Sequence, residues 1–117
     1  MSPLQPEPIQ SIRELGGEGS DLLEQIVRLY FDTTPALMVR LKSALAASDL
    51  EEIRSAAHSL KSSSANLGAR NLAQMCAALE ASARAGSIGT DAPKAEAIEH
   101  EYQAVCAALL TELGKST

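Results

Sequence analysis

The chain has 117 residues, a length that suits a single domain able to bury roughly 65% of its unfolded surface around one core. It is rich in alanine and leucine but has only one phenylalanine, two tyrosines and no tryptophan, a composition that favours helices over strands. The formal charge of −5 disfavours nucleic acid as a partner, and no apolar run reaches the roughly 20 residues needed to cross a bilayer.

The N-terminal residues contain three prolines within the first eight positions and lack the basic and apolar segments of a secretory signal. We expect residues 1–8 to form an extended lead-in or a linker, and residues 9–117 to form one helical domain in the cytoplasm. Residues 9–15 predict a short helix that ends at the two glycines 16 and 17. The two cysteines, Cys76 and Cys106, lie in apolar helical patterns and are expected to be small buried side chains.

The next predicted helix is strongly apolar and covers residues 20–32, with Ser20 as its N-cap and Asp21 in its first turn. The segment Thr33-Thr34-Pro35 interrupts this run. Proline removes a hydrogen bond from a helix interior but suits the first position after a threonine cap. We therefore expect a break or a sharp kink there, followed by a new helix that starts near Pro35.

Three further helices are predicted over residues 49–67, 69–85 and 91–114, each ended by a glycine. The first of them opens with a capping box, made either by Ser48 with Glu51 or, one residue later, by Asp49 with Glu52. The four helices that start near residues 35, 49, 69 and 91 predict an all-α, antiparallel four-helix bundle. The apolar segment 9–32 is expected to form an N-terminal helical cap over one end.

His58 lies opposite the apolar stripe of its helix when the residues are placed about 100° apart on a helical wheel. The stripe consists of Ile53, Ala56, Leu60, Ser63 and Leu67. The side shared with His58 carries Glu51, Arg54, Lys61, Ser62 and Ala65. We therefore predict a solvent-exposed imidazole with Arg54 and Lys61 about one helical turn away on either side.

The turn at Gly68 relates His58 to a carboxylate on the next helix. His58 lies ten residues before this glycine and Glu80 twelve after it, so in an antiparallel pair the two are level to within about 3 Å. A carboxylate there can accept the Nδ1–H of the imidazole and leave the Nε2 lone pair free.

An imidazole with a free Nε2 can attack a phosphoryl group in line, and neighbouring cations such as Lys61 and Arg54 would offset the added negative charge. Imidazoles ordinarily titrate near pH ~6.5, so the neutral form is abundant at cytosolic pH. The sequence has no acidic cluster for Mg²⁺ and no glycine-rich phosphate loop. The metal and the phosphoryl donor are therefore expected on a partner.

The string AHSLKSSSANLGA at residues 57–69, followed by Leu72, Cys76, Leu79 and Glu80, resembles the histidine-containing phosphotransfer (HPt) domain of bacterial two-component phosphorelays. The resemblance implies a carrier without kinase activity or a cofactor of its own, which moves a phosphoryl group from one receiver aspartate to another. By position it implies His58 as the phosphorylated residue, Lys61 as the cation beside it and Glu80 as the residue that orients the imidazole. The implied partners are response-regulator receiver domains and a hybrid sensor histidine kinase.

One position departs from the family pattern, because Ser62 stands where glycine usually follows the lysine. Serine is small, so we expect slower transfer or altered partner choice rather than loss of activity. Arg54, Ser55, Ser62 and Ala65 are expected to contact the receiver. We expect a monomer, because one exposed histidine serves both receivers and no large apolar patch is evident.

Two other hypotheses remain open from the sequence. The chain could be a helical adaptor that docks receiver or kinase domains without accepting phosphate. Alternatively, Glu51, His58 and Glu80 could hold a metal ion, although one histidine with dispersed carboxylates is a poor zinc site. The second histidine, His100, falls on a polar face and is expected to be an ordinary solvated side chain.

Overall fold

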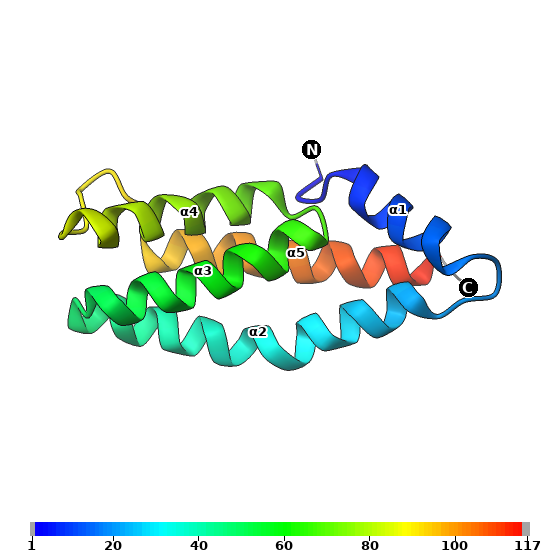
Figure 1. Ribbon diagram of the computed structural model, residues 1–117, viewed down its shortest axis with the longest axis horizontal. Helices are drawn as coiled ribbons and strands as arrows, with labels where there is room; N and C mark the ends of the chain where they lie inside the picture. The colour runs from blue at the N-terminus through cyan, green and yellow to red at the C-terminus, as the bar shows by residue number, and fades with distance from the viewer. Residues whose placement is uncertain (1, 116–117) are drawn as a thin grey trace.

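Five helices form in the computed structural model, which describes residues 2–115 (Figure 1). They are α1 (Pro6–Gly16), α2 (Leu22–Ala47), α3 (Leu50–Asn66), α4 (Arg70–Ala85) and α5 (Ala95–Gly114). Helices α2 to α5 lie side by side, each antiparallel to the one before it, and α1 packs against α2 at one end (Figure 1). The described residues contain no strand, so the predicted all-α bundle with a helical cap is confirmed.

The predicted break at Pro35 is wrong, because α2 continues through the proline with a shallow bend (Figure 1). Pro35 has no N–H to donate to the Phe31 carbonyl, and the Thr34 hydroxyl donates to the carbonyl of Tyr30 over 2.6 Å, a kind of bond that often accompanies a bend in a helix. The buried positions of α2 keep a spacing of three or four residues across the proline: Leu23, Val27, Tyr30, Thr34, Met38 and Leu41. The segment expected to be part of the cap is therefore the first half of α2.

The N-terminal lead-in is shorter than predicted, since α1 begins at Pro6 rather than at residue 9. Leu4 is buried, and the Gln5 N–H donates to the carbonyl of Gly68 over 2.7 Å. Gly68 has φ +82°, and a Cβ added there would lie 2.6 Å from the Gln5 carbonyl oxygen. The turn between α3 and α4 therefore requires glycine both for its backbone conformation and for this close approach.

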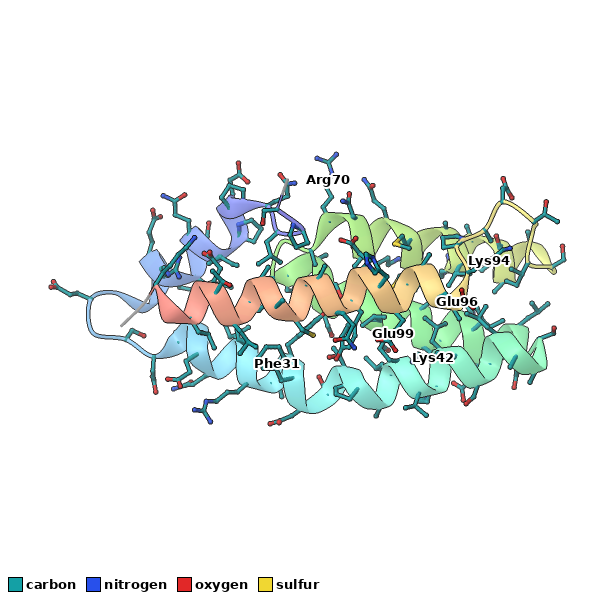
Figure 2. The ribbon with its side chains drawn as sticks, turned by 180° about the vertical axis from the view of Figure 1, so that it is seen from behind. Phe31, Lys42, Arg70, Lys94, Glu96 and Glu99 are labelled. Carbon is teal, nitrogen blue, oxygen red and sulfur yellow. The ribbon has the colours of Figure 1, made fainter. Side chains whose placement is uncertain are left out.

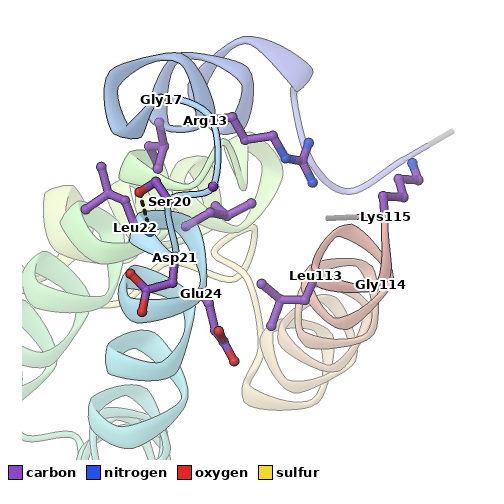
Figure 3. Close-up of a pocket in the computed structure, with 12 residues that line it drawn as sticks. Arg13, Gly17, Ser20, Asp21, Leu22, Glu24, Leu113, Gly114 and Lys115 are labelled. Atoms are coloured by element: carbon purple, nitrogen blue, oxygen red, sulfur yellow. Dashed lines mark hydrogen bonds between the residues drawn. The ribbon is translucent and has the colours of Figure 1, made fainter. Parts of the chain in front are cut away.

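The remaining helix ends differ from the predictions by a few residues. Asp49 caps α3 by accepting the Glu52 N–H over 3.2 Å, which selects the second register of the predicted capping box. Helix α2 begins at Leu22, yet the Ser20 hydroxyl still accepts the Leu22 N–H over 3.1 Å (Figure 3). Helix α5 begins at Ala95 rather than near residue 91.

The core consists of one face from each of the four long helices together with Leu4 and Ile9 near the N-terminus, and two hydroxyl pairs cross it. Tyr30 of α2 is hydrogen-bonded to Ser64 of α3 over 2.9 Å, and Thr34 of α2 to Tyr102 of α5 over 2.7 Å. These bonds satisfy polar groups that burial would otherwise leave without partners. None of the described helices is long and apolar enough to cross a membrane.

Candidate functional site

The His58 side chain projects from α3 into solvent, with 54% of its surface exposed. Its Nδ1 lies 2.9 Å from Oε2 of Glu80 on α4, so the contact predicted from the α3–α4 turn is present. A carboxylate can only accept, so Nδ1 carries the hydrogen of this bond. Nε2 is therefore the ring nitrogen with a free lone pair.

Glu80 is the most enclosed charged group of the site, with 5% of its side chain exposed. Besides His58, it accepts from Lys61 Nζ over 2.5 Å at Oε1 and from Arg84 Nη2 over 2.9 Å at Oε2. The hydrogen bond from Lys61 lowers the pKa of Glu80, burial opposes this effect, and the bond to His58 lowers the pKa further. Glu80 is therefore an anion at neutral pH that joins α3 and α4 through charge-assisted bonds.

The position of Lys61 adds to what the sequence indicated. It lies one turn from His58, as predicted, but in the unmodified protein its ammonium is bonded to Glu80. Arg84 was not among the predicted site residues. Glu80 and Arg84 are four residues apart on α4, a spacing at which opposite charges meet on a helix, so the sequence did carry a signal for this pair.

The four residues expected to contact a receiver lie on the same face of α3 as His58, since Ser55 is three residues from it, Arg54 and Ser62 are four, and Ala65 is seven. Arg54 is bonded to Glu51 over 2.5 Å, and this bond lowers the pKa of Glu51. The Ser55 hydroxyl accepts from Arg40 of α2, so it lies toward the α2 side of this face, whereas Lys61 lies toward α4.

Ser62 and Ala65 are exposed and line an open groove of about 660 Å³ together with Lys61. Small and neutral residues of α4, together with Gln5 and Pro8 of the N-terminal segment, form much of its wall. Among the described residues that line it, none is acidic and two are cations, Lys61 and Arg70. Arg70 extends outward from the start of α4 in Figure 2. Sequence reasoning missed the N-terminal wall because it depends on the contact between that segment and the α3–α4 turn.

A second cavity, of about 570 Å³, lies where the α1–α2 connection meets the end of α5 (Figure 3). Arg13, Asp21 and Lys115 are among its lining residues, and no predicted site residue lines it. Arg13 also donates to the Glu112 carbonyl over 2.7 Å and so fastens α1 to α5.

The second histidine, the two cysteines and the candidate metal ligands are accounted for by their surroundings in the fold. The exposed His100 lies on α5 near Lys42 and Glu99, which form an ion pair between α2 and α5 (Figure 2). Cys76 is buried and Cys106 partly buried, and burial raises the pKa of Cys76 to about 12. The described residues contain no group of three or more side chains arranged to hold a metal ion, and Glu51 is bonded to Arg54 rather than to His58.

Comparison with known proteins agrees with this architecture. The family model named Hpt domain matches residues 25–108. The crystal structure of histidine-containing phosphotransfer protein B (HptB) from Pseudomonas aeruginosa PAO1 matches with a TM-score of 0.82 and 29% sequence identity, over 96% of this chain and 95% of that one. The search of curated protein sequences gave no match. Since the matched segment runs from the first turn of α2 through most of α5, the chain belongs to the Hpt domain family, whose function is histidine phosphotransfer in two-component phosphorelays.

Proposed function

We propose that His58 is the residue of this Hpt domain that accepts a phosphoryl group from one receiver aspartate and passes it to another. The observation that carries the proposal is an exposed imidazole whose Nδ1 is bonded to a buried carboxylate. That bond fixes the tautomer and orients the ring, so that Nε2 faces a partner with its lone pair free.

The transfer needs no proton from solvent. The Nε2 lone pair of His58 forms the N–P bond while the P–O bond to the receiver aspartate breaks, and the electron pair leaves with the aspartate oxygen. The proton on Nδ1 stays there, bonded to Glu80. In the second transfer the N–P bond breaks, its electrons return to Nε2, and the second aspartate forms the new P–O bond.

Lys61 supplies positive charge one helical turn from the reacting nitrogen, and transfer of this kind depends mainly on positioning and charge stabilisation. Hpt domains are carriers rather than kinases. We propose that this one also has no kinase activity of its own, and that the Mg²⁺ for the reaction is bound by the receiver. Its partners would be response-regulator receivers and a hybrid sensor histidine kinase, which it meets as a cytoplasmic monomer.

For the receiver contact we propose Ser62 and Ala65 in the groove beside Lys61, together with Arg54 and Ser55 on the same face of α3. A hydroxymethyl group at residue 62 keeps the receiver slightly farther from His58 than a glycine would. Transfer is therefore expected to be slower than with glycine at this position.

The test uses a receiver domain carrying a radiolabelled aspartyl phosphate. The wild-type chain is expected to take up label that is stable to base and labile to acid, and the variant His58→Gln is expected to take up none. His100→Gln is the matched control, because it removes the other histidine of the chain, exposed on α5, and should leave labelling unchanged. Label that persists on His58→Gln would contradict the assignment. Receiver binding without any acid-labile label on the wild type would instead indicate a phosphate-independent adaptor.

A further inference from the structure

The hydrogen-bond donors around Glu80 are divided unevenly between its two oxygens. Oε1 accepts from Lys61, whereas Oε2 accepts from both His58 and Arg84. The charged or titratable groups that face this carboxylate are His58, Lys61 and, farther away, Arg54 on α3, together with Arg84 and the Cys76 thiol on α4. Lys61 is thus the bonded partner of one oxygen and also the cation nearest in sequence to His58.

Phosphorylation would set two anions in competition for Lys61. A phosphoryl group brings about two negative charges and three acceptor oxygens. Lys61 is one turn from His58 on the same helix and can reach that group by a change of rotamer. When it does so, Glu80 loses the bond that most lowers its pKa, while the burial that raises the pKa remains. A buried carboxylate without a compensating cation tends to take up a proton, and it then orients Nδ1–H less firmly.

We propose that Arg84 is a positioning residue for phosphotransfer, which keeps Glu80 charged and bonded to Nδ1 of His58 while Lys61 is engaged by the phosphoryl group. This inference rests on the function proposed above. It goes beyond that function by assigning separate tasks to the two cations that contact Glu80.

The geometry suits Arg84 to this task. Its Nη2 is bonded to Oε2, the same oxygen that accepts Nδ1–H, so it holds the oxygen that orients the ring. Arg84 projects from α4, while Lys61 and His58 share α3, so movement of Lys61 need not disturb it. Its side chain is 62% exposed, and it can stay on Glu80 without being buried itself.

A double-mutant cycle on the unphosphorylated protein tests the charge assignment directly. The Glu80 carboxyl would be titrated by ¹³C NMR in the wild type, Arg84→Gln, Lys61→Gln and the double variant. With Lys61 present, Arg84→Gln should raise the titration midpoint by about 0.2 pH units, because exposed ion pairs contribute little. With Lys61 replaced, which imitates its departure, the same change should raise the midpoint by about 0.7 units. Equal shifts in the two backgrounds, or no shift in either, would overturn the proposal.

A kinetic measurement connects this charge to the reaction. The rate of phosphoryl transfer from the chain to a receiver would be measured against pH for the wild type and three variants. In Arg84→Gln the midpoint of the acidic limb should move to higher pH by about half a unit. Arg84→Lys should reverse most of that shift. Arg28→Gln is the matched control, since Arg28 forms an exposed pair with Glu24 at the same four-residue spacing on α2. A profile of Arg84→Gln that superimposes on the wild type would overturn the proposal.

The two experiments separate the inference from the function on which it rests. If the wild type accepts no phosphate, the proposed function fails. The NMR cycle needs no phosphate and still decides whether Arg84 keeps Glu80 ionised when Lys61 is absent.

Discussion

Replacing Glu80 by glutamine tests the electrostatics of the site, because the amide keeps the shape of the carboxylate but not its charge. Glu80 is enclosed, but 32% of the Lys61 side chain and 62% of the Arg84 side chain are exposed, so solvent screens both pairs. Because of this screening, we expect the Lys61 bond to contribute only about 1–1.5 kcal/mol to the free energy of unfolding, and the Arg84 bond at most about 0.5 kcal/mol. Glu80→Gln should therefore lower the free energy of unfolding by about 1.5–2 kcal/mol at pH 7.

The same variant has a defined pH dependence. Lys61 holds the pKa of Glu80 in the folded protein below its ordinary value. The contribution of the carboxylate to stability is therefore complete above the pKa of the unfolded state and is lost as the pH falls through the pKa of the folded state. The difference in stability between wild type and Glu80→Gln should shrink toward zero below about pH 4.

Urea unfolding followed by circular dichroism at pH 7 and at acidic pH measures both effects. Glu24→Gln is the control, since its pair with Arg28 is exposed and should contribute less than about 0.5 kcal/mol. A Glu80→Gln variant as stable as the wild type at pH 7, or a difference that stays constant into acid, would refute the reasoning.

Three further predictions concern other parts of the fold. Gly68→Ala should lower the free energy of unfolding by about 2 kcal/mol, because φ is positive there and the new Cβ would meet the Gln5 carbonyl; an unchanged urea midpoint would contradict this. Ser62→Gly should cost about 0.5 kcal/mol of helix stability yet speed transfer from a phosphorylated receiver in rapid-quench measurements, and an unaltered rate would show that residue 62 does not limit receiver approach. Tyr30→Phe should destabilise by about 1–2 kcal/mol, because the buried Ser64 hydroxyl loses its partner; equal stability in urea would argue against that bond.

The position of His58 could be predicted because it depends on two regular repeats. The rotation per residue in a helix placed the imidazole opposite Ile53 and Leu60, and the rise per residue on either side of Gly68 brought Glu80 level with it. Both quantities are nearly constant in α-helices, so a local sequence was enough for this part of the site.

Features that depend on competition between partners could not be predicted in the same way. The bond between Lys61 and Glu80 reflects the enclosure of that carboxylate in the folded protein, whereas the sequence showed only that Lys61 lies near His58. The continuation of α2 through Pro35 likewise reflects tertiary packing. Met38 and Leu41 are buried in register with the residues before the proline, and this burial outweighs the lost backbone bond.

The bond between Nδ1 and Glu80 also has a consequence for the order of events in the relay. On the function proposed for His58, its Nδ1 is bonded to Glu80, so the phosphoryl donor and the phosphoryl acceptor must both react at Nε2 from the same side. Donor and acceptor therefore cannot be bound at the same time, and each cycle alternates between phosphorylation and dephosphorylation of the carrier. An acceptor in large excess would then bind the unphosphorylated carrier, block the donor and so slow its own phosphorylation.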